Sequence, residues 1–339
     1  MGLPRADRRR ICNWNSLFHI FLLGSGDMID TVVSFEMLVE EVMQIKKNRL
    51  APDECTGQER RLCIATGSHG DELNGQYICY QVIRRIKENF GDLTGIVDVY
   101  PAMNPLGLDS QTRNFPLVDV DMNTVFPGDE DGVIIDYTAS KLIKDMAGAD
   151  FCLDLHSSNA LIREIPQVRL NDDVAETIMP YARLLNTELV WIHPSTSVRP
   201  GSLSYALNAI GVKTMVVEAG AALRIDYEYC EQIVDGIFSL MKHLGIWQGE
   251  VAEIRKPILA TDGEISFVNA ESSGMFVPNI KHNMWVKKGE KIGTIVDVIT
   301  GSEEERVFAP CNGLVFTFRE YPAIEEGALI ARIYGGERS

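Results

Sequence analysis

Apolar and polar residues alternate along most of the chain with two periods, one typical of strands and one typical of helices. Short apolar or β-branched runs predict buried strands at residues 61–66, 96–100, 151–156, 188–192 and 213–218. Between these runs, apolar residues recur at helical spacing in residues 73–90, 137–147, 172–186, 202–210 and 226–244. Strands that alternate with helices in this way predict an α/β fold, with a mostly parallel sheet and helices on both faces.

The pattern changes after Trp247. From residue 254 onward, short alternating segments are separated by turns rich in Gly, Pro and Asn, which is typical of an all-β domain. We therefore expect an α/β domain over residues 28–250 and a β-rich, barrel-sandwich-like domain over residues 254–339.

Residues 1–27 fit neither domain. A cluster of arginines precedes a patchy apolar stretch at residues 16–23, which is the outline of a secretory signal. Polar residues interrupt the apolar part, however, and no Ala-x-Ala-like cleavage site follows it. We expect an N-terminal extension that is disordered or not native, with a signal or anchor as the alternative.

Two polar motifs lie where predicted strands end. His69 and Glu72 follow the strand at 61–66, and His156 closes the strand at 151–156. In α/β folds the carboxyl ends of such strands are where sites are built. Two imidazoles and one carboxylate are the ligands of a catalytic zinc ion that keeps its fourth position open for water. The pattern predicts a zinc hydrolase with one zinc ion per chain.

Composition limits the partners and the compartment. Acidic residues outnumber basic ones by 48 to 32, which gives a net charge of −16 and argues against nucleic acid or an anionic membrane as partner. No apolar run approaches the ~20 residues that a membrane span needs. The seven cysteines are an odd number without a Cys-x-x-Cys pair, which favours a reduced, cytoplasmic protein.

Five motifs in order give the chain a family resemblance. They are Gly67-Ser68-His69-Gly70-Asp71-Glu72, Asn104-Pro105, Asp121-Met122-Asn123, Asp154-Leu155-His156-Ser157 and Val217-Glu218-Ala219-Gly220. Together they resemble the succinylglutamate desuccinylase/aspartoacylase family, the deacylating relatives of the zinc carboxypeptidases. The resemblance covers about residues 28–246 and implies a zinc carboxypeptidase-like fold with a mixed, mostly parallel sheet. The terminal β domain also has a counterpart in that family.

The resemblance also implies roles for individual residues. His69, Glu72 and His156 would hold the zinc ion, and Glu218 matches the family's general base. Arg113 lies in a long polar loop at residues 109–132 and matches the arginine that stabilises the oxyanion. Asn123 matches the asparagine that contacts the substrate carboxylate.

One departure from the family concerns substrate recognition. The family usually follows this asparagine with an arginine that completes a forked carboxylate clamp, whereas this chain has Thr124. A hydroxyl does not replace a bidentate guanidinium, so recognition of a free α-carboxylate is an open question. Arg163 and Arg169 are the two candidates that could supply the charge instead.

The function expected from these observations is zinc-dependent hydrolysis of the amide bond of a small N-acyl amino acid or N-acyl amine. The alternatives are a metallocarboxypeptidase or amidase that acts on a peptide or peptidoglycan fragment, and a metal- or metabolite-binding protein without turnover. The sequence identifies neither the acyl group nor the amine, and it leaves open whether the chain forms a homo-oligomer.

Overall fold

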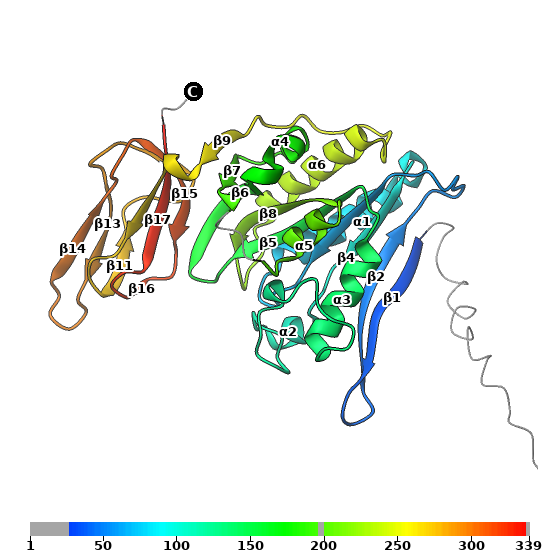
Figure 1. Cartoon of the computed structure of the whole chain (residues 1–339). Helices are drawn as coiled ribbons and strands as arrows, with labels where there is room; N and C mark the ends of the chain where they lie inside the picture. Colours follow the sequence, from blue (N-terminus) through cyan, green and yellow to red (C-terminus); the bar gives the residue numbers. More distant parts are fainter. Residues whose placement is uncertain (1–26, 196–199, 337–339) are drawn as a thin grey trace, which may run out of the picture.

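A parallel sheet lies at the centre of the computed structural model, which describes residues 27–195 and 200–336 (Figure 1). Its central strands are neighbours in the order β4-β3-β5-β8 and run parallel to one another. Their bounds are β3 (Arg61–Thr66), β4 (Ile96–Tyr100), β5 (Phe151–Ser158) and β8 (Lys213–Ala221). Near-continuous apolar runs form these strands because both faces of a parallel sheet are buried. The predicted α/β fold is confirmed.

Further strands make the sheet a mixed one. The hairpin of β1 (Asp27–Glu36) and β2 (Val42–Leu50) pairs antiparallel with β4 at one side. At the other side, β6 (Ile162–Asn171) runs antiparallel to β8, and β7 (Leu189–His193) runs parallel to β6. The mixed, mostly parallel sheet implied by the family resemblance is thus present.

Helices cover both faces of this sheet. Leu62 and Ile64 lie in one apolar core with α1 (Asn74–Glu88), α4 (Asp172–Ala182) and α6 (Tyr227–Leu244). Cys63 and Ala65, which point to the opposite face, lie in a second core with α3 (Ile134–Met146) and α5 (Leu203–Ala209). The connections carry short helical segments, namely η1 (Phe90–Asp92), α2 (Pro105–Ser110), η2 (Met122–Thr124) and η4 (Asp262–Glu264). Among the described helices, none has the length and apolarity that crossing a membrane requires.

The C-terminal part forms an antiparallel β domain, as predicted (Figure 1). One of its layers is a four-stranded sheet in the order β14-β13-β11-β16, and a separate apolar core fills the domain. The strands of this layer are β11 (Gly274–Pro278), β13 (Lys291–Val296), β14 (Glu303–Phe308) and β16 (Ala323–Ile324). The other layer consists of β10 (Ile265–Asn269), β12 (Met284–Val286), β15 (Gly313–Arg319) and β17 (Leu329–Gly335).

The two domains share a continuous sheet. β15 pairs antiparallel with β6, with Thr317 opposite Glu164, and the linker strand β9 (Ile258–Thr261) pairs parallel with β7. Within the described residues, the central sheet therefore extends through 13 strands into the C-terminal domain. The sequence pattern predicted the β domain but not this backbone pairing.

Of the described strands from β3 to β8, β6 is the one that the sequence pattern did not predict. Pro166 lies inside it and removes a backbone donor, which is typical of edges and bulges rather than of sheet interiors. The register between β6 and β8 shifts between Glu164 and Gln167, so a bulge accommodates the proline. Asp27, the last residue of the predicted N-terminal extension, is the first residue of β1. Residues 1–26, the rest of that extension, lie outside the described part of the chain.

Deleting residues 254–339 is expected to abolish soluble expression of the remaining chain. The deletion removes β15, which pairs with β6. It also uncovers Trp191, because Phe316 packs edge-on against it with the ring centres 5.4 Å apart. An unpaired strand edge next to exposed apolar side chains favours aggregation. Size-exclusion chromatography of the soluble fraction measures the effect.

Arg224→Met is the control for this deletion, because it removes the 2.6 Å ion pair between Arg224 and Glu320 of the C-terminal domain and a hydrogen bond to the Ala160 carbonyl, but leaves the pairing of β15 with β6 in place. This variant should remain soluble. A deletion variant that elutes as a folded, monodisperse species would show that the α/β domain does not depend on the shared sheet.

Candidate metal centre and active site

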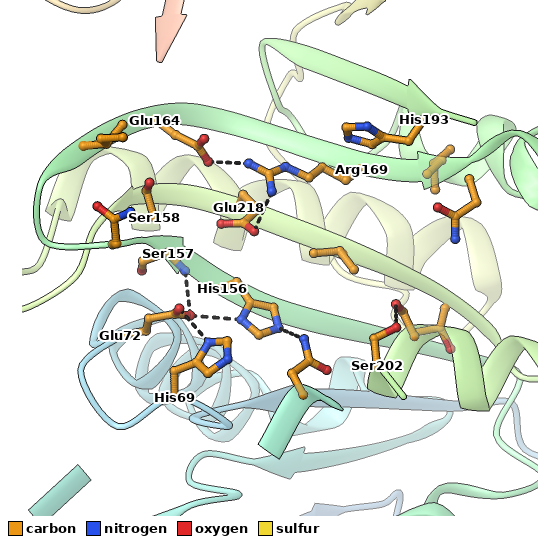
Figure 2. A pocket seen from close by; sticks show the side chains of 18 of the residues that line it. His69, Glu72, His156, Ser157, Ser158, Glu164, Arg169, His193, Ser202 and Glu218 are labelled. Carbon is orange, nitrogen blue, oxygen red and sulfur yellow. Dashed lines mark hydrogen bonds and ion pairs between the residues drawn. The ribbon is translucent and has the colours of Figure 1, made fainter. Parts of the chain in front are cut away.

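Two neighbouring parallel strands bring the predicted metal ligands together. His69 and Glu72 lie in the turn between β3 and α1, and His156 lies near the carboxyl end of β5. Because β3 and β5 are parallel neighbours, these ends meet at the same edge of the sheet. All three side chains are buried, and Figure 2 shows them pointing toward one another.

The donor atoms of these residues converge on one point. His69 Nδ1 lies 2.7 Å from Glu72 Oε1, and His156 Nδ1 lies 3.0 Å from Glu72 Oε2. One potential ligand atom from each residue lies within 4.8 Å of the others. This set of two imidazoles and one carboxylate fits a zinc ion.

The outer nitrogens of both imidazoles also face carboxylates. His69 Nε2 lies 2.9 Å from Asp121 Oδ1, and His156 Nε2 lies 3.1 Å from Asp154 Oδ1. Metal-binding histidines commonly have such partners, which fix the orientation of the ring. Asp121 and Asp154 lie within two of the five sequence motifs, but the motifs alone give them no role.

The electrostatics of the cluster favour a bound cation. Burial alone would lower the pKa of His156, yet the charges of Asp154 and Glu72 raise that pKa well above its ordinary value. The pKa of His69 is also raised, because hydrogen bonds with Asp121 and Glu72 outweigh the effect of burial. Three carboxylates thus surround two imidazoles in a buried space, where a metal ion would balance the excess negative charge.

The Asn104-Pro105 motif and Gly70 hold the long loop against the metal-site turn. Asn104 caps α2 by accepting from Gly107 N at 2.9 Å, and its Nδ2 donates to the Ser68 carbonyl at 3.3 Å. A Cβ on Gly70 would lie 1.9 Å from the Gly107 carbonyl carbon, so only glycine allows this approach. Gly70 N also donates to the Thr112 carbonyl at 3.0 Å, directly before Arg113.

This arrangement places Arg113 beside the converging donor atoms. Its Nη1 donates to Glu72 Oε1 at 3.3 Å, and its Nη2 donates to Asp121 Oδ2 at 3.1 Å. Asn123 also lines the cavity, with Nδ2 3.5 Å from His156 Nε2 and Oδ1 accepting from Leu203 N at 2.9 Å.

Glu218 lies opposite His156 in the pairing of β8 with β5 and lines the same cavity. Burial raises the pKa of the Glu218 carboxyl above its ordinary value, and the charge of Arg169 opposes that rise. In the described part of the chain, Glu218 does not belong to the group of converging metal donors. Its position separates it from the metal ligands, as a general base would require.

The structure distinguishes the two arginine candidates for substrate binding. Arg169 lines the cavity, and its Nη1 lies 3.1 Å from Glu218 Oε1. Arg163 is not part of the described cavity lining; it pairs with Asp226 at 2.6 Å and with Glu320 at 3.4 Å. Thr124, which replaces the family's arginine, donates its hydroxyl to the Asp121 carbonyl at 2.6 Å.

The cavity around these residues has a volume of about 560 Å³, which suits a small molecule. Its lining includes three ionisable residues that were not among the predicted site residues: Glu164, His193 and Arg332. Burial and the charge of Arg169 lower the pKa of His193 to about 4, so its imidazole is neutral at pH 7. Arg332 comes from β17 of the C-terminal domain, and no sequence motif marks it.

The chain is similar to known proteins over most of its length. The family model of the succinylglutamate desuccinylase/aspartoacylase catalytic domain matches residues 58–244. The chain is 23% identical over 294 residues to the N-alpha-acetyl-L-2,4-diaminobutyric acid deacetylase of Halomonas elongata, covering 82% of each protein.

Solved structures show the same fold. The product-bound ectoine utilization protein EutE (DoeB) of Ruegeria pomeroyi superimposes with a TM-score of 0.79 at 19% identity, covering 94% of this chain and 98% of that one. A succinylglutamate desuccinylase/aspartoacylase from Rhodobacter sphaeroides superimposes with a TM-score of 0.77 at 19% identity, with coverages of 93% and 97%.

Proposed function

Because the chain belongs to the succinylglutamate desuccinylase/aspartoacylase family, we propose that it is a zinc-dependent hydrolase of the amide bond in a small N-acyl amino acid or N-acyl amine. The family supports amide-bond deacylation as the class of reaction. The observation that carries the zinc-dependent mechanism is the buried cluster of His69, Glu72 and His156, with Glu218 in the same cavity.

The first part of the mechanism concerns the attacking water. A zinc ion bound by His69, Glu72 and His156 would polarise the amide carbonyl and lower the pKa of water. Glu218 accepts the proton that water loses on attack and returns it to the leaving nitrogen. A carboxyl whose pKa is raised by burial is suited to both transfers, because its basicity lies closer to neutral pH.

The second part concerns charge on the substrate. As water attacks, negative charge develops on the carbonyl oxygen, and the Arg113 guanidinium beside Glu72 stabilises it. Preorganised stabilisation of this kind is commonly worth ~3 kcal/mol. We assign Asn123 and Arg169 to the non-reacting part of the substrate, because both line the cavity. The ion pairs of Arg163 outside the cavity lining leave it without a substrate role in this proposal.

The substrate that we propose combines a short acyl group with an amino acid or diamine. The Halomonas elongata relative is a deacetylase of N-alpha-acetyl-L-2,4-diaminobutyric acid, and the cavity of about 560 Å³ admits molecules of that size. We also propose a cytoplasmic location, since the described cysteines have free thiols.

A screen of the zinc-loaded full chain tests this function. Its substrates are N-acetyl and N-succinyl derivatives of α-amino acids and of diamines, and a fluorogenic reagent measures the primary amine released. We expect zinc-dependent release from at least one N-acyl compound. Release of C-terminal residues from peptides, with no N-acyl compound cleaved, would instead indicate a carboxypeptidase. Stoichiometric zinc without turnover of either class would indicate a binding protein.

A further inference from the structure

A side chain of the C-terminal domain reaches the catalytic cavity. Arg332 lies on β17 and lines the cavity together with Glu164, Arg169 and Glu218 of the α/β domain. The proposed chemistry uses Glu218 directly and gives no role to Glu164 or Arg332.

Three consecutive ion pairs connect Arg332 to Glu218. Arg332 Nη1 lies 2.6 Å from Glu164 Oε1, Glu164 Oε2 lies 2.7 Å from Arg169 Nη2, and Arg169 Nη1 lies 3.1 Å from Glu218 Oε1. Figure 2 shows the last two of these contacts above the metal ligands. Positive and negative side chains therefore alternate along the series, and each one forms an ion pair with the next.

The bulge in β6 makes this series possible. In a regular strand, residues five positions apart point to opposite faces, so Glu164 and Arg169 would not meet. The register shift between Glu164 and Gln167 brings both side chains to the cavity. Arg169 can therefore contact Glu164 of its own strand and Glu218 of the neighbouring one.

Both oxygens of Glu164 are occupied, and its side chain is 1% exposed. Oε1 accepts from Arg332 and, at 3.4 Å, from the Thr317 hydroxyl of β15, while Oε2 accepts from Arg169. The guanidinium carbons of Arg169 and Arg332 each lie 5.6 Å from the centre of the Trp191 ring, a contact that restrains both side chains. The carboxylate is thus held by the C-terminal domain on one side and presents its other side to Arg169.

We propose that Arg332 is a positioning residue for Glu218, acting through Glu164 and Arg169. The proposal rests on the function proposed above, in which Glu218 transfers protons. Removing Arg332 leaves the buried Glu164 with one cationic partner, Arg169. A buried charge that loses a partner is strongly destabilising, so a closer contact with the remaining partner is favoured. Arg169 is then drawn toward Glu164 and away from Glu218, so the carboxylate of Glu218 loses its orientation toward the reacting atoms.

Steady-state kinetics of Arg332→Met test the proposal on the substrate found by the screen. Displacement of a reacting group by about 1 Å can lower a rate by roughly 10²-fold, so we expect kcat to fall by roughly 10- to 100-fold. Zinc content should stay close to that of the wild type, and any rise in KM caused by the movement of Arg169 should be smaller than the fall in kcat. Arg332→Lys, which keeps a charge able to reach one Glu164 oxygen, should recover part of kcat. Arg224→Met, which removes another ion pair to the C-terminal domain, should leave kcat unchanged.

A double variant distinguishes action through Arg169 from an independent effect. If Arg332 acts through Arg169, then Arg332→Met should lower kcat no further in an Arg169→Met background, because the two effects share one path. Additive losses would overturn the proposal. A raised KM with unchanged kcat would also overturn it, since that result would make Arg332 a substrate-binding residue.

A crystal structure of Arg332→Met supplies a readout that does not depend on turnover. We expect the Arg169 Nη1 to Glu218 Oε1 contact, 3.1 Å in the wild type, to be broken. An unchanged contact would overturn the proposal even if kcat fell. A wild-type enzyme that cleaves no substrate would refute the proposed function instead, while the structure of the variant would still decide whether Arg332 controls the position of Arg169. If Arg332→Met does not fold, the same comparison is made with Arg332→Lys, for which a longer contact is expected.

Discussion

Glu218→Gln is expected to lower kcat by roughly 10²–10⁴-fold while the protein keeps its zinc. Glutamine has nearly the same shape as glutamate, and its amide oxygen can still accept from Arg169, which lies 3.1 Å from Glu218 Oε1. The amide has no useful basicity, so it cannot accept a proton from water or deliver one to the leaving nitrogen. Zinc content and kcat are measured on the same samples.

Glu188→Gln is the matched control. Glu188 is also largely shielded from solvent and paired with an arginine, because Arg255 Nη1 lies 2.6 Å from its Oε1. It does not belong to the described cavity lining, so this variant should keep near wild-type kcat. If Glu218→Gln retained full zinc and near wild-type kcat, Glu218 would have no part in proton transfer. If it lost its zinc, Glu218 would be a fourth ligand rather than a base.

His69→Ala combined with His156→Ala is expected to lose both the zinc and the activity. Each imidazole supplies one ring nitrogen to the converging donor group, and a lone Glu72 carboxylate does not hold zinc tightly. A ligand that binds only the folded state stabilises it by about 2.7 kcal/mol at a concentration of 100 Kd. Added zinc should therefore raise the Tm of the wild type but not that of the double variant.

His282→Ala serves as the control for the histidine variants. His282 contacts Tyr229 in the described structure and is not one of the converging donors. It should retain zinc, activity and the zinc-dependent rise in Tm. Stoichiometric zinc in the His69→Ala/His156→Ala variant, measured by atomic emission, would place the metal elsewhere.

The metal cluster could be predicted from sequence because its residues lie at the ends of buried strands. Apolar runs at 61–66 and 151–156 predicted two strands, and both are present with parallel pairing. Parallel pairing places His69, Glu72 and His156 at one sheet edge without further information. Glu218 closes the predicted strand at 213–218, and β8 pairs parallel with β5, but its role as the base was implied by the family resemblance.

The part of the cavity formed by β6 could not be predicted in this way. Pro166 interrupts the apolar pattern, and the bulge beside it changes which residues face the cavity. Arg163 and Arg169 were therefore equivalent in the sequence, although only Arg169 lies in the described cavity lining. Arg332 was unpredictable for a different reason: its position depends on how β15 of the C-terminal domain pairs with β6.

The carboxylates that contact the outer nitrogens of the two histidines could not be predicted from the sequence either. Asp121 lies 52 residues from His69 in the sequence, but its Oδ1 is 2.9 Å from His69 Nε2. This contact depends on the path of the loop at 109–132, which has no periodicity that would predict it. Sequence motifs thus indicated the residues that would bind the metal, whereas the fold was needed to identify those that orient them.

The zinc dependence of hydrolysis is tested by measuring zinc content and turnover on the same samples of the full chain before and after chelation. We expect one zinc ion per chain, loss of N-acyl amide hydrolysis when zinc is removed, and recovery when one equivalent is restored. Undiminished hydrolysis by protein shown to be free of all metals would exclude a zinc-dependent mechanism.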